Sequence, residues 1–238
     1  MSSTHAPKKH VSFRRRESTE GRVRTSLQTT STAFLATIVD ELKAHAPFTI
    51  VGAVTGVALT VVLASSVVPR SLSVGLFMGL HPVHVFLSAL VTTGMYRSHS
   101  AGRFWATTLI GYFGSVGIAT LSDCVIPYLG ECLLGLPNKG IHLGFIESWW
   151  LVNPLAVAGI AVAYRWPATK FPHAGHVLLS TWASVSHMTM AIGNTLSYAA
   201  MAVIFIFLFL AVWLPCCTSD ILFPLLFSRE SNDNEGPI

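Results

Sequence analysis

The chain has 238 residues, of which 52% are apolar and only 11% are charged, and its formal net charge is +4. This composition lies outside the usual mix of a soluble domain and predicts an integral membrane protein, with a lipid bilayer and no nucleic acid as its partner. The four cysteines lack the spacing of a secreted disulfide framework, so a disulfide-stapled extracellular domain is excluded.

The first segments of the chain are basic and then amphipathic. Residues 1–30 carry many Lys and Arg without an apolar core, which predicts a disordered cytoplasmic tail and no cleaved signal peptide. These cations would fix the orientation of the chain or contact anionic lipids. Residues 31–47 place Phe34, Leu35 and Ile38 on one helical face. That pattern predicts an amphipathic interfacial helix or, alternatively, an extension of the first span.

Six apolar windows follow, each long enough or nearly long enough to cross a bilayer, which requires about 20 mostly apolar residues. They predict an all-α polytopic membrane protein with about six transmembrane helices. The fourth and fifth windows are short. The windows are 48–68, 76–96, 104–122, 149–165, 174–192 and 196–214.

The basic residues between these windows predict the orientation, because cytoplasmic loops carry the excess of Lys and Arg. With the N-terminus inside, the outer loops hold only Arg70 and Lys139. The inner loops and the C-terminal tail hold Arg97, Arg103, Arg165, Lys170 and Arg229. This asymmetry predicts a multi-pass protein of the cytoplasmic or plasma membrane with both termini in the cytoplasm.

Two phrases each occur twice, in the same order. His-x-x-His-Val-x-Leu-Ser stands at 81–88 and 173–180, and Ser-Asp-x-x-x-Pro-x-Leu stands at 122–129 and 219–226. We interpret the pattern as an internal duplication, with chance matches between apolar segments as the alternative. Each copy falls in three spans, so the two halves would cross the membrane in opposite senses, as the inverted repeats of secondary transporters do.

The duplication divides the chain into a first three-helix repeat at 48–137 and a second at 149–227. An outer loop at 138–148 joins them, and a polar tail follows at 228–238. Within the first repeat, residues 124–136 are too few to span the bilayer and are predicted to dip in and return. Broken or re-entrant segments of this kind hold the ion sites of many transporters.

The repeated phrases carry ionisable residues into membrane segments, where such residues are costly and usually functional. On a helix, residues i and i+3 share a side, so each His-x-x-His pair could bind one ion together with an Asp. Imidazole and carboxylate suit Zn, Mn, Fe, Co or Ni. The candidate metal ligands are His81, His84, Asp123, His173, His176 and Asp220, supported by Ser88, Ser180, Ser122 and Ser219.

Two arrangements of these ligands stay open. They either converge through broken helices into one central site or form two half-sites toward opposite faces. The histidine pairs could also serve only as interhelical hydrogen-bonding groups, and duplication with an Asp partner is what favours metal or proton binding. His187 is left out of the site because the other half has no equivalent, and His142 and Glu147 are assigned to an outer re-entrant or interfacial loop.

The Ser-Asp-x-x-x-Pro phrase, beside a proline-marked helix break, resembles that of the heavy-metal permeases related to arsenical and manganese exporters. That family is polytopic and internally duplicated, and the resemblance implies ion transport. It covers only two short stretches, and the chain departs from the family in its paired histidines and its smaller number of spans, so the substrate is not carried over. The matching residues are Ser122, Asp123, Pro127, Ser219, Asp220 and Pro224.

Together these features predict a permease for a divalent transition-metal cation, with protons as a candidate coupling ion, more readily than an enzyme. The alternative is a membrane-embedded zinc-dependent hydrolase, although the chain has no His-Glu-x-x-His phrase. A bis-histidine haem protein is a third class, in which one histidine of each pair would face the other across a bundle. The metal, the direction of movement and the formation of a homodimer stay open.

Overall fold

The computed structural model describes residues 49–62, 70–99, 104–166, 170–192 and 198–217, with a few isolated helical positions between 36 and 47. The predicted tails at 1–30 and 228–238 lie outside the described residues, as do most of 31–47 and both Ser219 and Asp220. The side chains of 170–174, including that of His173, are also outside the description. The long helices all belong to one compact unit, Glu41–Ile238.

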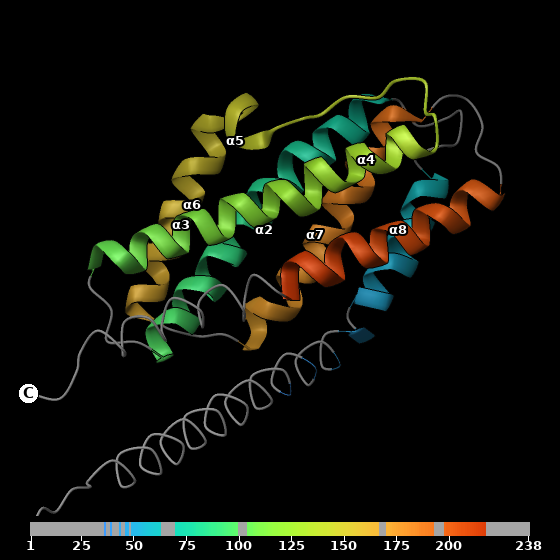
Figure 1. Ribbon diagram of the computed structural model, residues 1–238. Helices are drawn as coiled ribbons and strands as arrows, with labels where there is room; N and C mark the ends of the chain where they lie inside the picture. The colour runs from blue at the N-terminus through green and yellow to red at the C-terminus, as the bar shows by residue number, and fades with distance from the viewer. Residues whose placement is uncertain are drawn as a thin grey trace, which may run out of the picture. The chain divides into compact units, whose positions relative to one another are not determined.

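Every described element of this unit is a helix (Figure 1), which confirms the all-α prediction. An apolar helix at Thr49–Val62 comes first. The elements that follow are α2 (Arg70–His99), α3 (Phe104–Thr120), the π-helix η1 (Leu121–Val125), α4 (Ile126–Leu133), α5 (Gly144–Glu147), α6 (Trp149–Arg165), α7 (Lys170–Ala191) and α8 (Tyr198–Cys217).

Three of these segments are long and apolar enough to cross a membrane, namely Arg70–Ser98, Phe104–Leu133 and Ala199–Cys216. At about 1.5 Å per residue, the two longer segments exceed the roughly 30 Å of a hydrocarbon core. A described helix lies in each of the six predicted windows, but Thr49–Val62 and α6 are short, and α7 contains many Ser, Thr and His residues. The structure therefore confirms a helical protein with three candidate membrane spans.

The predicted re-entrant segment at 124–136 is wrong. Residues 104–133 form one continuous helical run in which η1 joins α3 to α4. Pro127 directly follows η1 within this run, and the helix continues although the proline has no N–H to donate to the preceding turn. Pro82 likewise lies inside α2 without ending the helix. Neither proline breaks its helix.

Helix α2 is the centre of the packing, because α3, α6 and α7 all lie against it (Figure 1). The contact with α6 is close at Gly159, where a Cβ would collide with the carbonyl oxygen of Phe86 and with Ala89. Small residues at such crossings let two helix backbones approach, which is common in membrane proteins. This close packing encloses the middle of α2.

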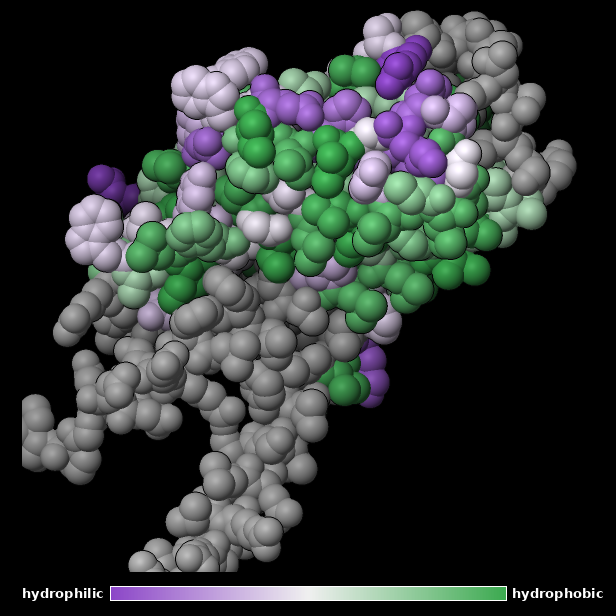
Figure 2. All heavy atoms as spheres, turned by 45° about the horizontal axis from the view of Figure 1, so that its top comes forward, coloured by the Kyte–Doolittle hydropathy of each residue, from purple (hydrophilic) through white to green (hydrophobic). Residues whose placement is uncertain are grey.

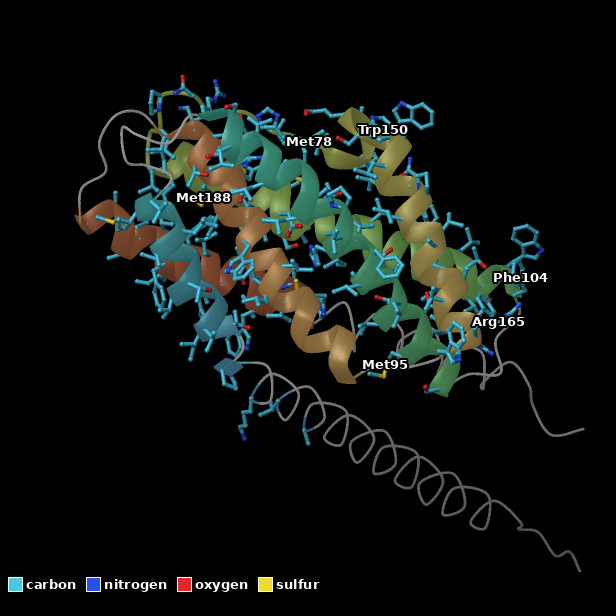
Figure 3. All side chains as sticks on the ribbon, turned by 180° about the vertical axis from the view of Figure 1, so that it is seen from behind. Met78, Met95, Phe104, Trp150, Arg165 and Met188 are labelled. Atoms are coloured by element: carbon cyan, nitrogen blue, oxygen red, sulfur yellow. The ribbon has the colours of Figure 1, made fainter. Side chains whose placement is uncertain are left out.

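The helices of this unit have two well-defined ends. Figure 3 places Met95, Phe104 and Arg165 toward one end and Met78, Trp150 and Met188 toward the other. At the first end, the Arg97 guanidinium donates to the carbonyls of Ala163 and Tyr164 and lies 4.7 Å from the centroid of the Tyr164 ring. These bonds satisfy carbonyls that the end of α6 would otherwise leave unpaired.

The outward faces of the helices are apolar. Figure 2 shows hydrophobic residues over most of one face and hydrophilic residues gathered along its upper edge. Exposed side chains include Trp105, Leu109, Phe113, Leu129 and Ile206. Exposed apolar surface of this extent suits contact with lipid better than contact with water.

No internal repeat is evident among the described helices. His81 and His84 lie in the middle of α2, whereas positions 173 and 176 fall in the first two turns of α7. Asp123 lies in η1, inside a continuous helix, and its proposed equivalent lies outside the described residues.

Helix length makes a testable prediction about the membrane crossing. Ser98 lies in the last turn of α2, at one end of the unit, and Lys139 follows α4, beyond the whole helical run 104–133. We expect Ser98→Cys and Lys139→Cys, each in a background without native cysteines, to react with an impermeant maleimide from opposite sides of sealed vesicles. Labelling of both positions from the same side would contradict a crossing by this segment.

Candidate metal centre

Asp123 is the centre of the candidate site. Its Oδ2 atom accepts hydrogen bonds from Nδ1 of His81, at 2.9 Å, and from Nδ1 of His84, at 2.6 Å. Its Oδ1 atom accepts from the hydroxyls of Ser122 and Ser180, both at 2.8 Å. A carboxylate that accepts from four donors is well satisfied in its ionised form, although it is fully buried.

The bonds to Asp123 assign the tautomers of the two histidines. The ionised carboxylate can only accept, so Nδ1 of each ring carries a proton, and in a neutral ring Nε2 then carries the lone pair. Within the described residues, Nε2 of His81 and Nε2 of His84 are buried and have no hydrogen-bond partner. An imidazole anchored through Nδ1 to a carboxylate, with Nε2 left to bind, is the usual arrangement of a metal-ligating histidine.

His84 connects this centre to residues of α7 and α8. Its ring stacks on that of His176 from α7, with centroids 5.7 Å apart and planes inclined by 12°. Ligand atoms of His84, His176 and Cys216 all lie within 4.8 Å of one another, and all three side chains are buried. Two imidazoles and a thiol, which binds as thiolate, suit Zn²⁺ and other borderline metal ions.

A second group of possible ligands shares His84. The ligand atoms of His81, His84 and Asp123 also lie within 4.8 Å of one another. The two Nδ1 atoms meet at one carboxylate oxygen, so their Nε2 atoms point away from Asp123. We interpret Asp123 as the residue that orients both rings, and the Nε2 side of His84 as the better position for an ion.

The π-helix explains how Asp123 reaches the core. A π-turn adds one residue to a helical turn, which changes the direction of the side chains and frees backbone carbonyls, and such turns often occur at functional sites. The hydroxyl of Ser184 on α7 lies 3.0 Å from the carbonyl oxygen of Ser122 and 2.8 Å from that of Ser180. This hydroxyl can therefore stabilise the π-turn from the facing helix.

The centre lies far from either end of α2. His84 is near the midpoint of a 30-residue helix, so about 20 Å of helix extends on each side. His81, His84 and His176 are each 1% exposed, and Asp123 and Ser180 are 0% exposed. A metal ion here would be fully shielded from water.

Predicted residues from both halves of the chain meet in one cluster, which favours a central site over two separate half-sites for the described ligands. The residues brought together are His81, His84, Asp123, His176, Ser122 and Ser180. Ser88 is buried on α2, and the structure shows no hydrogen bond from it to either histidine. The predicted roles of His173, Asp220 and Ser219 lie outside the described residues.

Sequence reasoning missed two parts of this region. Cys216 was not among the predicted ligands, because nothing in its apolar surroundings marks it as one. His187 was set aside for lack of a repeated equivalent, yet its Nδ1 lies 2.8 Å from Oε1 of Glu131, and both side chains are buried. The cost of burying an ionisable residue in an apolar segment was a signal for this second pair.

Comparisons of the chain with protein-family models, with curated proteins and with solved structures found no match. What the structure supports is a helical protein with candidate membrane spans and buried His, Asp and Cys side chains that could hold a metal ion.

Gly144 offers a test of the position of His81. A Cβ at Gly144 would collide with Cδ2 and Nε2 of the His81 ring, whereas a Cβ at Gly117 would meet nothing within 4 Å. We expect Gly144→Ala to displace the ring from Asp123 and to weaken Zn²⁺ binding about 10-fold, as the loss of an orienting contact commonly does. Equilibrium dialysis should show wild-type affinity for Gly117→Ala. Equal affinities for the two variants would remove His81 from the site.

Proposed function

We propose that the chain is a membrane transporter for a divalent transition-metal cation. The cation would bind between His84, His176 and Cys216, with Asp123 orienting His84 through its Nδ1–H group. In keeping with the sequence, the protein would lie in the cytoplasmic or plasma membrane with both termini inside.

The depth of the ligand cluster is the observation that carries this proposal. The cluster lies beside the midpoint of a helix long enough to cross a membrane, and its side chains are almost completely inaccessible to water. Secondary transporters bind their ions near the bilayer midplane and expose the site to each side in turn. A site of this depth is therefore well placed to be reached alternately from either side.

Two further features support the proposal. The π-turn that carries Asp123 is a local departure from α-helix in a membrane-length segment, of the kind that transporters use where ions bind. The Ser122, Asp123 and Pro127 phrase resembles that of heavy-metal permeases. Six spans, an inverted duplication and a possible second protomer remain parts of the proposal.

Proton release should accompany metal binding. Cys216 must lose its thiol proton to become a good ligand. In the structure its Sγ atom lies 3.5 Å from the hydroxyl of Ser180, which in turn donates to Asp123. This chain of hydrogen bonds links the thiol to the buried carboxylate. Metal affinity should accordingly fall in acid, where the ligands hold their protons.

Reconstituted vesicles provide the direct test. Vesicles containing wild-type protein and a trapped fluorescent indicator should take up Zn²⁺ or Mn²⁺ faster than protein-free vesicles, and the double variant His84→Ala/His176→Ala should not. His142→Ala changes a histidine that is about one third exposed and should retain uptake. Wild-type vesicles that match protein-free vesicles for both ions would contradict transport of these ions.

One observation also favours a membrane-embedded zinc hydrolase. Three protein ligands with a fourth position left over, close to a carboxylate, is the usual arrangement of a catalytic zinc site. Zinc-dependent release of fatty acid from lipid esters or amides by the purified protein, lost in His84→Ala, would establish this alternative.

The parallel stack of His84 and His176 argues against haem, whose iron needs two rings that direct nitrogen atoms at it from opposite sides.

A further inference from the structure

A second buried acid–base pair lies outside the metal centre. Nδ1 of His187 on α7 is 2.8 Å from Oε1 of Glu131 on α4, and the two side chains are 0% and 1% exposed. The ring of Phe77 lies between this pair and the metal centre, with its centroid 5.3 Å from both the His187 and the His81 rings. The two polar sites are therefore neighbours separated by one aromatic side chain.

Backbone donors assign the protonation state of this pair. The N–H of His142 donates to Nε2 of His187 at 3.3 Å, so Nε2 carries a lone pair and the proton of a neutral ring lies on Nδ1. The N–H of Gly140 donates to Oε2 of Glu131 at 3.1 Å, while Oε1 accepts from His187. Both carboxylate oxygens are acceptors, so the observed arrangement fits an ionised Glu131 and a neutral His187.

The hydrogen bonds from the N–H groups of Gly140 and His142 also hold the segment 137–144 in place. A third backbone bond, from the N–H of Asn138 to the carbonyl of Ala191 at 3.2 Å, attaches its first residues to α7. Among the contacts of the described residues, the middle of the segment is thus tied to the helices through Glu131 and His187. Hydrogen bonds to a charged acceptor are about twice as strong as neutral ones, so the charge on Glu131 stabilises this attachment.

The far end of the segment covers the metal centre. The backbone of Gly144 lies so close to His81 that a Cβ would collide with the Nε2 side of the ring. Leu143 packs beside Phe77, Cys124 and Met190 in a cluster next to the centre. A shift of this segment would open space at the unpaired Nε2 atom of His81 and around Phe77.

We propose that Glu131 is a proton-binding site, separate from the metal centre, that holds segment 137–144 over His81 while ionised and releases it when protonated. The proton adds to Oε2, because Oε1 already accepts from Nδ1–H of His187. Oε2 then becomes a hydroxyl oxygen and a weaker acceptor for the N–H of Gly140. His187 cannot take the proton at Nε2 without losing the bond from His142. As far as metal movement is concerned, this inference rests on the proposed transport function.

A partly exposed acid–base pair lies next to His187. His142 and Glu147 form a partly exposed pair at 3.2 Å, and the His142 ring lies 5.4 Å from that of His187. The other titratable side chains in this region are few. They are Tyr128 and Cys132 on α4, Cys124 in η1, Lys139 in the segment itself, and His81 of α2 beyond Phe77. Helix α8 carries no Asp, Glu, Lys, Arg or His.

Amide hydrogen exchange tests the proton site without any transport assay. In wild-type protein, exchange of peptides spanning 138–143, corrected for the intrinsic effect of pH, should become about 10-fold faster or more on acidification, because a charged acceptor is lost. Glu131→Gln should show fast exchange at every pH. Glu131→Asp keeps a titratable carboxyl and should keep the pH dependence.

Glu147→Gln is the matched control, since it makes the same chemical change at a carboxyl that is 47% exposed. It should behave like wild type. A Glu131→Gln protein that is monodisperse and helical but retains the wild-type pH dependence would overturn the proposal. So would wild-type protein in which exchange of the segment does not respond to pH.

Vesicle assays then ask whether the proton site is coupled to metal movement. In wild-type vesicles an imposed pH gradient should drive Zn²⁺ or Mn²⁺ accumulation. Glu131→Gln should lose accumulation but retain exchange of internal for external metal, because its metal ligands are intact. Gradient-driven accumulation by Glu131→Gln at the wild-type level would refute coupling. If wild-type vesicles move no metal, the transport function fails, and the exchange data still decide the proton site.

Discussion

Asp123→Asn is expected to abolish metal binding and metal movement while the helices remain folded. The asparagine side chain has nearly the same shape, and its oxygen can still accept from Ser122 and Ser180. Its amide nitrogen, however, faces Nδ1 of both histidines as a donor. Each neutral ring would then have to accept at Nδ1 and carry its proton on Nε2, which removes the lone pair that would bind the metal.

The expected loss exceeds that of an ordinary orienting partner. Removal of one such partner commonly costs 10- to 100-fold in metal affinity, about 1.4 to 2.7 kcal/mol, and here two rings change tautomer together. Elemental analysis of purified protein should find metal in the wild type and none in Asp123→Asn. The nitrogen chemical shifts of labelled imidazoles should show the change of tautomer directly, and a merely structural role for Asp123 would not produce that signature.

Ser180→Ala is the matched comparison for this result. It removes one donor to Oδ1 but leaves both Nδ1–H bonds and therefore both tautomers in place. Metal affinity should fall by about 10-fold, well short of the loss in Asp123→Asn. Equal losses in the two variants would mean that Asp123 acts through packing or charge alone. Wild-type metal binding by Asp123→Asn would remove the carboxylate from the site.

The helices and much of the site could be predicted from the sequence because each depends on local or repeated patterns. Apolar windows of membrane length located the helices. A chain that crosses lipid must pair its backbone N–H and C=O groups internally, as a helix does. The His-x-x-His and Ser-Asp phrases identified His84, Asp123 and His176 as candidate ligands. Ionisable residues in apolar segments cost free energy to bury and are usually functional. The structure brings these residues together, although no internal repeat is evident among the described helices.

The parts that sequence did not predict depend on tertiary contacts. Pro127 indicated a break, but the helical run 104–133 continues through this proline, which directly follows a π-turn. Cys216 becomes a candidate ligand only because α8 packs its end beside α7. Glu131 and His187 are 56 positions apart, and no spacing rule connects residues so distant in the chain.

The second large effect is expected for His84→Ala, because His84 belongs to both groups of possible ligands. Its loss leaves His176 and Cys216 as the only members of their group and removes one of two imidazoles from Asp123. Two remaining ligands cannot complete a stable transition-metal site, which normally has at least three from the protein. We expect loss of bound Zn²⁺ or Co²⁺, with more than a 100-fold fall in affinity.

His81→Ala separates this interpretation from a site centred on Asp123. It removes a ring that belongs only to the group with Asp123, and it leaves His84, His176 and Cys216 in place. If the ion binds on the Nε2 side of His84, His81→Ala should cost about 10-fold, the usual effect of a neighbouring group, and should preserve full metal stoichiometry. Cobalt absorption would show a thiolate-to-metal band in both the wild type and His81→Ala. Loss of metal in His81→Ala with metal retained in His84→Ala would move the ion to the other side of Asp123, next to Gly144.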